Sequence, residues 1–478
     1  MANLFKPSKT NTVVRPKDAN KTLQITGIDH LARGISNDEK GIYFVQGALP
    51  DETVEANVQQ HKGNVHHAQV THIIQPSEAR RQPFCAHYAE CGGCETQHCD
   101  SEDLLRFKQQ AIGQLILHTG IQANEPVVIK KAKLGARRNI KPKARTIASL
   151  QKELPWQPPL NSVDRHYRHK TRLAIDARNP HDIHLGFRTR GSSDVFNLTQ
   201  CPILVPELQA LIAPLHTLVN SISQPLRIGH ITLVKSNNKT LVSIRLVKAL
   251  SKEDQLAITD FAQQQNVAVE IQTQTGHHNV GEEDSLLTYS PIDSIELQFQ
   301  PDDFVQVNAK VNQQMVAQAI DWLALDKDDK VLDLFCGIGN FSVPIAQHCA
   351  QVIGIEGVSK MVQRATKNAQ NNGLPHCQFR HSDLTDPAWI RTLANEKVTK
   401  VLLDPSREGA KEAIKLLPSL NPSHILYVSC NPSTFARDAA ILLEQNFRID
   451  KIGLMDMFPQ TAHTELMALF VPSNTKSS

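Results

Sequence analysis

The C-terminal third of the chain carries three side chains that could act together on a bound substrate. Cys430 follows the apolar run HILYVS and precedes Asn431 and Pro432, so we expect it at the carboxyl end of a buried strand. A cysteine thiolate is a strong nucleophile, although a lone cysteine is more often a buried core residue. Asp404 ends the apolar run KVLL, and Glu465 lies in FPQTAHTE, just before the last apolar run. Together these residues favour a nucleophile at Cys430 over a core cysteine.

A glycine-containing segment, DLFCGIGNF, predicts a site for a nucleotide cofactor. Gly337 and Gly339 follow an apolar strand and let a ligand approach the backbone there. Ser342 stands where a dinucleotide fingerprint requires a third glycine, which disfavours pyrophosphate binding. Glu356 ends the next apolar run and is placed to accept hydrogen bonds from ribose hydroxyls. The pattern suits both NAD and S-adenosylmethionine, and it does not choose between them.

A cysteine cluster in the N-terminal half predicts a metal centre. Three cysteines are closely spaced in PFCAHYAECGGCETQHC: Cys85, Cys91 and Cys94. Three such thiolates with a distant fourth suit a cubane iron–sulfur cluster, and the spacing differs from that of a paired zinc knuckle. Cys99 is a local candidate for the fourth ligand. A zinc site that recruits His87 or His98, and a set of free thiols, are the alternatives.

Composition and length exclude several classes of protein. The chain has 478 residues, 40% hydrophobic and 21% charged, which excludes a disordered or coiled-coil chain and allows roughly three domains. Nine cysteines are too few for a disulfide scaffold of this size. The first residues are polar rather than a signal segment, and we find no convincing membrane span. We therefore expect a cytoplasmic monomer with reduced thiols and no membrane association.

The net charge of +3 conceals a strongly basic stretch. Residues 127–172 contain 13 Lys and Arg against two acidic residues. Such a concentration of cations is typical of a surface that meets a polyanion, the alternative being a solvated loop. We interpret 125–160 as a basic insertion that could form an additional phosphate-binding arm, and 1–20 as a disordered basic tail.

Three further regions are expected to fold. Residues 21–78 show short strands broken by glycines, which predicts a small β-barrel of the oligonucleotide-binding kind that resembles a TRAM domain. Residues 79–300 mix strands and helices, including a helix over 101–119, and predict an α+β domain. In 301–478 strands alternate with helices, which predicts a doubly wound parallel sheet. Its final hairpin is typical of an α/β class I methyltransferase domain with a Rossmann-like sheet.

The motifs taken together resemble one enzyme family. FVQVN, DLFCGIGNF, LLDPSREG, VSCNP and FPQTAHTE occur in the order found in RNA uracil-5-methyltransferases, and the resemblance runs from about residue 22 to residue 471. Within that family they are most similar to the RumA/RlmD type, which methylates 23S ribosomal RNA at uridine 1939. Ser406 and Glu408 depart from the DP(P/A)R-type loop of the family, whereas Asp404 and Arg407 are retained.

The resemblance implies roles for individual residues. Cys430 resembles the nucleophile that adds to C6 of uracil, and Glu465 the base that removes the C5 proton. The residues implied for S-adenosylmethionine are Gln306, Phe335, Asn340, Glu356, Asp383 and Asp404. A cysteine in GFRTRGSSDVFNLTQCPIL, here Cys201, is implied as the fourth ligand of a 4Fe-4S cluster with Cys85, Cys91 and Cys94.

The same resemblance implies that the N-terminal barrel and the central domain bind RNA. Candidate contacts in the central domain are Tyr167, Arg168, Lys170, Arg172, Arg188 and Arg190. Three other functions stay open: methylation of uracil in tRNA or at another rRNA site, an iron–sulfur oxidoreductase, and an RNA-binding protein with an inactive catalytic fold. The pairing of Cys430 with Glu465 disfavours the last two.

Overall fold

The computed structural model describes residues 20–124, 154–281, 286–393 and 395–473. Residues 1–19 of the predicted tail and 125–153 of the predicted insertion lie outside the described residues. Contacts divide the chain into two compact units, one from the described parts of Met1–Pro83 and Glu95–Ile112, the other from those of Phe84–Cys94 and Gly113–Ser478. Within the described ranges, none of the helices has the length and apolar character that a membrane crossing requires.

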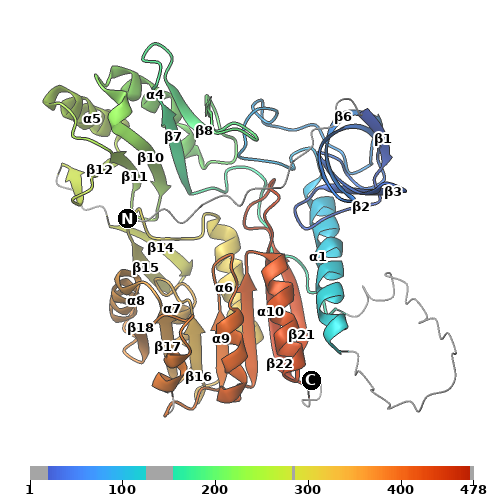
Figure 1. Cartoon of the computed structure of the whole chain (residues 1–478). Coiled ribbons are helices and arrows are strands. Elements are labelled where there is room, and N and C mark those ends of the chain that lie inside the picture. Colours follow the sequence, from blue (N-terminus) through green and yellow to red (C-terminus); the bar gives the residue numbers. More distant parts are fainter. Residues whose placement is uncertain (1–19, 125–153, 282–285, 394, 474–478) are drawn as a thin grey trace. The chain divides into compact units, whose positions relative to one another are not determined.

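The N-terminal unit contains a curled six-stranded β-sheet (Figure 1). Its strands are β1 (Asn20–Gln24), β2 (Gly27–Ile28), β3 (Gly34–Asp38), β4 (Gly41–Gln46), β5 (Thr53–Lys62) and β6 (Val65–Gln75). The order is β1-β5-β6-β4-β3-β2, so the two edge strands are consecutive in sequence. Between them, Ile25 and Thr26 donate backbone hydrogen bonds to the carbonyls of Glu52 (2.8 Å) and Ile35 (2.9 Å). The two residues that join β1 to β2 therefore bond to chain segments next to both edges of the sheet.

A seven-stranded sheet forms the central part of the second unit. Its strands are β7 (Lys170–Asp176), β8 (His184–Arg188), β9 (Val195–Asn197), β10 (Ile228–Lys235), β11 (Thr240–Leu246), β12 (Ala268–Gln272) and β13 (His277–Val280). The order is β13-β12-β11-β10-β7-β8-β9, and the β11–β12 pair is parallel while the others are antiparallel. These strands belong to the mixture of strands and helices expected for residues 79–300.

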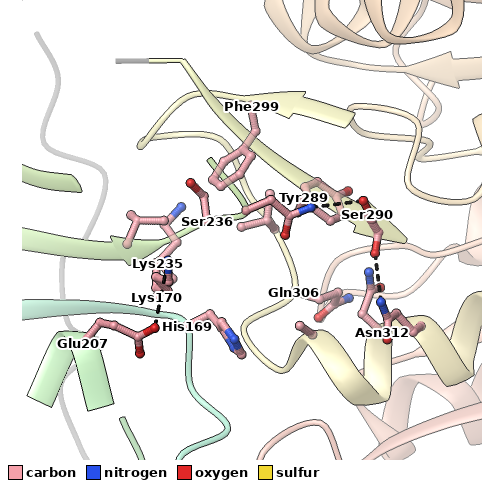
Figure 2. A pocket seen from close by; sticks show the side chains of 15 residues that line it. His169, Lys170, Glu207, Lys235, Ser236, Tyr289, Ser290, Phe299, Gln306 and Asn312 are labelled. Carbon is pink, nitrogen blue, oxygen red and sulfur yellow. Dashed lines mark hydrogen bonds and ion pairs between the residues drawn. The ribbon is translucent and has the colours of Figure 1, made fainter. Parts of the chain in front are cut away.

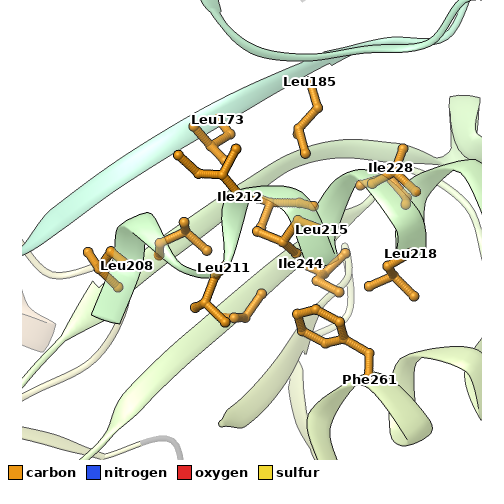
Figure 3. Close-up of a cluster of buried hydrophobic side chains, with 14 of the residues drawn as sticks. Leu173, Leu185, Leu208, Leu211, Ile212, Leu215, Leu218, Ile228, Ile244 and Phe261 are labelled. Atoms are coloured by element: carbon orange, nitrogen blue, oxygen red, sulfur yellow. The ribbon is translucent and has the colours of Figure 1, made fainter. Parts of the chain in front are cut away.

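Helices cover the central sheet through a continuous apolar core. They are α3 (Pro206–Gln209), α4 (Ile212–Ser221) and α5 (Lys252–Gln265), with a short 3₁₀ turn at Pro225–Arg227. Figure 3 shows Leu215 and Leu218 of α4 and Phe261 of α5 gathered with side chains from the strands, among them Ile244. Burial of these side chains is the main stabilisation of the layer.

The helix predicted over 101–119 is α1 (Ser101–Asn124).

The end of the predicted basic insertion belongs to the folded core, which corrects its boundary. Trp156 and Leu160 form isolated bridges with Ile452 and Met455, and the Leu160 N–H donates to the Leu454 carbonyl at 2.9 Å. These partners lie in β21 (Phe447–Met455), an edge strand whose free backbone groups can accept an added segment. The prediction followed the Lys, Arg and Pro content of the stretch and missed its last apolar side chains.

The C-terminal sheet positions the predicted catalytic residues. Its strands are β16 (Lys330–Leu334), β17 (Gln351–Glu356), β18 (Cys377–His381), β19 (Lys400–Leu403), β20 (His424–Ser429), β21 (Phe447–Met455) and β22 (Glu465–Pro472), in the order β18-β17-β16-β19-β20-β22-β21. Five strands are parallel, and β22 is antiparallel to both of its neighbours. This confirms the doubly wound sheet with a final hairpin.

The connections of this sheet place its ligand site. Its helices are α6 (Ala309–Leu323), α7 (Ser342–Ile345), α8 (Ser359–Asn371), α9 (Lys411–Leu416) and α10 (Pro432–Glu444), with 3₁₀ turns at Pro387–Leu393 and Leu417–Leu420. A separate hairpin, β14 (Leu287–Ile292) and β15 (Ile295–Phe299), precedes α6. The direction of strand addition reverses between β16 and β19, and ligands of such sheets bind at the carboxyl ends of the strands at this point.

Candidate active site

A pocket of about 440 Å³ lies at the carboxyl ends of the parallel strands of the C-terminal sheet. Seven of the side chains predicted for the site line it: Gln306, Phe335, Asn340, Glu356, Asp404, Cys430 and Glu465. They come from segments as far apart as the residues before α6 and the first residue of β22. The fold therefore brings the predicted nucleophile, base and cofactor residues into one cavity.

The loop after β16 has a backbone that few side chains tolerate. The φ angles of Gly337 and Gly339 are +56° and +93°, in the left-handed region that favours glycine. Phe335 also has a positive φ, 63°, which is unusual for a bulky residue and occurs most often at functional sites. The Gly337 N–H donates to Oε2 of Glu356 (3.1 Å), and the Val358 N–H donates to Oε1 (2.9 Å). These bonds orient the Glu356 carboxylate at the end of β17.

A polar network lines the other side of the pocket. Asn340 and Asn312 exchange side-chain hydrogen bonds of 3.0 and 3.1 Å, and the Tyr289 hydroxyl donates to Oδ1 of Asn340 at 3.0 Å. Gln306 lies nearby, and its buried Oε1 has no hydrogen-bond partner among the described residues. A buried amide oxygen without a partner is costly, so this position is suited to a ligand that donates a hydrogen bond.

Cys430 lies where the strand-to-helix turn exposes it. Strand β20 ends at Ser429, and Asn431 caps α10 by accepting a hydrogen bond from the Ser433 N–H (3.0 Å). Cys430 stands between strand and helix and is half-buried. Burial, together with the negative charges of Glu465 and Asp404, raises the pKa of its thiol to about 11, and the Arg407 cation opposes them. The free thiol is therefore largely protonated at neutral pH.

Glu465 is a buried carboxyl group with a high pKa. It is the first residue of β22 and is 5% exposed. Burial, together with the Asp404 charge, raises its pKa to about 8, and the Arg407 cation opposes the rise. Burial also raises the pKa of Asp404 to about 7. A carboxyl group that changes ionisation near neutral pH can take up and release a proton during a reaction.

Comparison with known proteins defines the family. A family model described as tRNA (Uracil-5-)-methyltransferase matches residues 138–471. Proteins of Vibrio cholerae and Shewanella sediminis, both named 23S rRNA (uracil(1939)-C(5))-methyltransferase RlmD, are each 38% identical to this chain over 98% of its length and 99% of theirs. The chain belongs to the RNA uracil-5-methyltransferase family.

The fold of this uracil-5-methyltransferase family member also matches a solved relative. The crystal structure of tRNA (uracil-54, C5)-methyltransferase from Pyrococcus abyssi, in complex with S-adenosyl-L-homocysteine, aligns with a TM-score of 0.67. The alignment covers 94% of this chain and 99% of that one at 19% identity. At this level of identity the match supports the multidomain fold, with its N-terminal curled sheet and C-terminal methyltransferase domain.

One predicted cofactor residue of the family lies elsewhere. Asp383 is exposed and does not line the described pocket. Its Oδ1 accepts hydrogen bonds from the N–H and hydroxyl of Thr385, at 2.8 and 2.7 Å. These bonds lower the pKa of Asp383 and stabilise the turn after β18. In this conformation the Asp383 side chain stabilises the turn in which it lies and does not line the pocket.

The sequence reasoning missed Tyr289, which lines the pocket, and Asn312, which does not line it but bonds to the side chain of Asn340. Tyr289 comes from β14, outside the methyltransferase sheet, and no motif marks it. Asn312 is 2% exposed on the buried face of α6, one turn after its N-cap, Asn308. The sequence signal that could have identified Asn312 is an amide side chain on the apolar face of this helix. The loop departures at Ser406 and Glu408 leave Asp404 and Arg407 at the pocket.

Several of the candidate RNA contacts also have partners within the chain. Tyr167 is buried, and its hydroxyl donates to the Pro459 carbonyl at 3.0 Å. Arg190 donates to the carbonyls of Tyr88 (2.9 Å) and Cys94 (2.7 Å). Arg190 therefore holds the cysteine segment. Arg172 and Arg188 are exposed, and Arg188 donates to the Ser193 carbonyl at 2.6 Å.

The cysteines predicted to bind a cluster fall in one compact unit. Cys85, Cys91 and Cys94 are half-buried, and Cys201 is buried. Burial raises the pKa of Cys201 to about 12, and the nearby Cys94 and Cys91 thiols contribute to the rise. The pKa of Cys91 is raised by burial and by Cys85. The four thiols thus interact electrostatically.

The same region differs from a preformed site for a single ion. Among the described residues, no group of three or more His, Cys, Asp and Glu side chains is arranged to hold one metal ion. Cys99 belongs to the other compact unit, where Asp103 and Asp100 add to the effect of burial on its raised pKa. The His87 ring nitrogen Nε2 lies 2.7 Å from the Thr199 hydroxyl.

Proposed function

We propose that this protein transfers a methyl group from S-adenosylmethionine to C5 of a uridine in 23S ribosomal RNA, at the position numbered 1939 in the names of its relatives. The observation that carries the proposal is the presence of Cys430 and Glu465 in one pocket with Glu356 and Gln306. A thiol and a buried carboxyl group at a cofactor cavity suit a reaction that needs a nucleophile and a base.

The pocket offers both polar and apolar groups that match those of S-adenosylmethionine. The Glu356 carboxylate, fixed by two backbone N–H groups, can accept hydrogen bonds from ribose hydroxyls. The unpartnered Oε1 of Gln306 can accept from the amino group of the methionine part, and Phe335 offers apolar contact. When bound, S-adenosylmethionine supplies an electrophilic methyl carbon on a positively charged sulfur.

The side chains of this chain perform the rest of the reaction. C5 of uracil is a weak nucleophile, so the Cys430 thiol first gives up its proton to solvent, and the resulting thiolate adds to C6. The electron pair of the C5–C6 double bond moves into an enolate with carbanion character at C5. After C5 is alkylated, the Glu465 carboxylate takes the C5 proton. The electrons of that C–H bond restore the C5–C6 double bond, and the Cys430 sulfur leaves as a thiolate.

A direct test of the proposal measures the product in RNA. The purified protein should transfer a labelled methyl group to unmodified 23S ribosomal RNA, and nuclease digestion should locate 5-methyluridine at the single expected position. A labelled methyl group in tRNA, or at a different rRNA uridine, would instead support the alternative uracil-5-methyltransferase functions. No transfer to any RNA would contradict the proposal.

The reaction should become faster as the pH rises towards 8. Glu465 must be ionised to accept a proton, and its pKa is about 8, so the rate should increase from pH 6 through pH 8. The Cys430 thiol, with a pKa of about 11, must also lose its proton, so the rate should keep rising above pH 8. Arg407 lowers the pKa of both Glu465 and Cys430, so Arg407→Gln should move the profile to higher pH. The profile of kcat/KM reports the free enzyme. Arg391→Gln, an exposed control, should leave the profile in place, and an unshifted Arg407→Gln profile would contradict the assignment.

The cysteines suit a 4Fe-4S cluster held by Cys85, Cys91, Cys94 and Cys201. A cubane presents a separate iron to each thiolate and so requires a wider set of ligands than a single ion does. The Arg190 cation that holds the Cys94 carbonyl is also suited to a negatively charged cluster. The cluster would join the cysteine segment to the region of Cys201 and stabilise the central domain, and no step of methyl transfer requires it.

Loss of the fourth ligand should remove the cluster. Cys201→Ala protein, purified without oxygen, should lose most of its iron and sulfide and unfold at a lower temperature. Cys99→Ala is the matched control, because it also replaces a buried cysteine, and it should retain the iron. Iron loss in Cys99→Ala with retention in Cys201→Ala would reverse the assignment.

The domain functions follow the same proposal. Residues 21–78 form a TRAM-type barrel that binds RNA, 79–300 an iron–sulfur domain and 301–478 the methyltransferase domain. On the N-terminal sheet the Arg33 guanidinium lies 4.5 Å from the centre of the Phe44 ring, and His67 stacks on that ring at 5.9 Å. Aromatic and cationic side chains together are suited to unpaired bases and phosphates.

A further inference from the structure

A second cavity adjoins the active-site pocket within the same compact unit (Figure 2). Its volume is about 340 Å³, within the range of small-ligand sites. Among the lining residues that the two cavities share are Tyr289, Val305 and Gln306. A ligand in the second cavity would therefore lie beside whatever occupies the first, with the Gln306 side chain between them.

The walls of this second cavity combine cations with amides and apolar surface. Lys235, at the end of β10, has its Nζ atom 4.0 Å from Oε1 of Glu207. The Asn237 amide donates to the Ser290 hydroxyl at 3.0 Å. Phe299 contributes apolar surface, as Figure 2 shows. Cations, amides and an aromatic ring are the groups that bind the phosphate, the base edges and the base face of a nucleotide.

Lys170 adds a cation to the floor of the cavity. Its Nζ atom donates to the backbone carbonyl of Asp303 at 2.6 Å, so this hydrogen bond does not neutralise its charge. Burial lowers the pKa of Lys170 to about 8. An anionic group in the cavity would favour the protonated form. The position is therefore suited to a phosphate.

We propose that the second cavity binds a nucleotide next to the target uridine in the RNA strand, with Lys170 and Lys235 at its phosphate and Asn237 at its base. This inference rests on the proposed function. An enzyme that acts on C5 and C6 must take the uridine out of the base stack, and the adjoining nucleotides must then follow the strand away from the pocket. A cavity that shares a wall with the active site lies on that course. Contacts there would help to select the sequence around the methylated uridine.

Because the two cavities share the Gln306 side chain, one other possible occupant of the second cavity must be distinguished from RNA. The carboxylate of the cofactor's methionine part is also an anion and could reach Lys170 past Gln306. The two occupants predict different measurements: a nucleotide site changes RNA affinity at one position of the strand, whereas a carboxylate site changes the KM for S-adenosylmethionine.

The test uses the full chain and a fluorescent single-stranded RNA that spans the uridine and its neighbours. One abasic nucleotide is placed in turn at each flanking position, and dissociation constants are measured by anisotropy. In the unaltered protein one adjoining position should be sensitive, with a loss of about tenfold. Asn237→Ala should weaken binding of the intact RNA by a similar factor, and the abasic site at that position should then cause little further loss. Lys235→Ala should weaken binding of the intact and the abasic RNA alike, because an abasic nucleotide keeps its phosphate.

Lys248→Ala is the matched control, because it removes the same charge from an exposed residue outside the cavity. It should keep the full sensitivity to the abasic site. If the losses caused by Asn237→Ala and by the abasic site multiply at every position, or if Lys235→Ala changes only the KM for S-adenosylmethionine, the proposal is overturned. Binding is measured without methyl transfer, so an inactive protein that shows the coupling would disprove the proposed function and retain the subsite, and an active protein without the coupling would do the reverse.

Discussion

Cys430→Ala protein is expected to lose methyl transfer to RNA by roughly 10⁴-fold or more, as enzymes that lose a covalent nucleophile do. Without the sulfur, C5 of uracil keeps its low nucleophilicity, and neither the cofactor site nor Glu465 can replace the missing addition at C6. The half-buried thiol is small, so its removal should leave the fold intact. Transfer of a labelled methyl group to 23S ribosomal RNA measures the loss, and RNA binding measured by anisotropy should change little.

Cys349→Ala is the matched control for this variant. Cys349 is 7% exposed in the same domain, and its thiol donates to the Ile345 carbonyl at 3.5 Å, away from the pocket residues. It should methylate within a few-fold of the unaltered protein. A Cys430→Ala protein that methylates at a similar rate would show that the reaction proceeds without the covalent adduct.

The candidate catalytic residues could be predicted to lie in one site because strand ends leave a local signature. Cys430 follows an apolar run and precedes a capping Asn431 and a Pro432 that suits the first turn of a helix, so its position depends on neighbouring residues alone. The same holds for Glu356, which ends the run QVIGIE. In a doubly wound sheet the carboxyl ends of these strands meet, so the strand order implies one shared site.

The rest of the site depends on contacts between distant segments. Tyr289 reaches Asn340 from a hairpin about 50 residues earlier in the chain, and nothing near Tyr289 in sequence marks it as a pocket residue. Trp156 pairs with Ile452 across about 300 residues, so the composition of its own segment indicated a loop. Asp383 shows the opposite case, because its bonds to Thr385 are local and could have been anticipated from an Asx turn.

Glu465→Gln protein is expected to accumulate a covalent complex with RNA. The amide keeps the size of the side chain and cannot accept the C5 proton, so the reaction should stop after methyl transfer with the Cys430–C6 bond intact. Turnover should fall by about 10²–10⁴-fold, the usual contribution of a general base. On a denaturing gel the adduct should appear as a slowly migrating band that carries both the labelled methyl group and the RNA.

Glu412→Gln supplies the matched control for this second variant. It makes the same change at a side chain that is 51% exposed on α9 and paired with Lys415, so it should turn over normally and give no stable band. Rapid turnover by Glu465→Gln, or a stalled protein without the adduct, would assign the base to another group.

The Glu465→Gln substitution should also raise the stability of the fold above pH 5. The folded-state pKa of Glu465, about 8, lies well above the ordinary 4.5 of a glutamate. Stability associated with the neutral carboxyl group is therefore fully present below pH 4.5 and is lost as the pH rises through about 8. The amide of the Glu465→Gln protein stays neutral throughout, so the difference in Tm between the two proteins should widen from pH 5 to pH 8. Burial of an ionisable group that catalysis requires is thus expected to lower the stability of the fold at the pH where the group works.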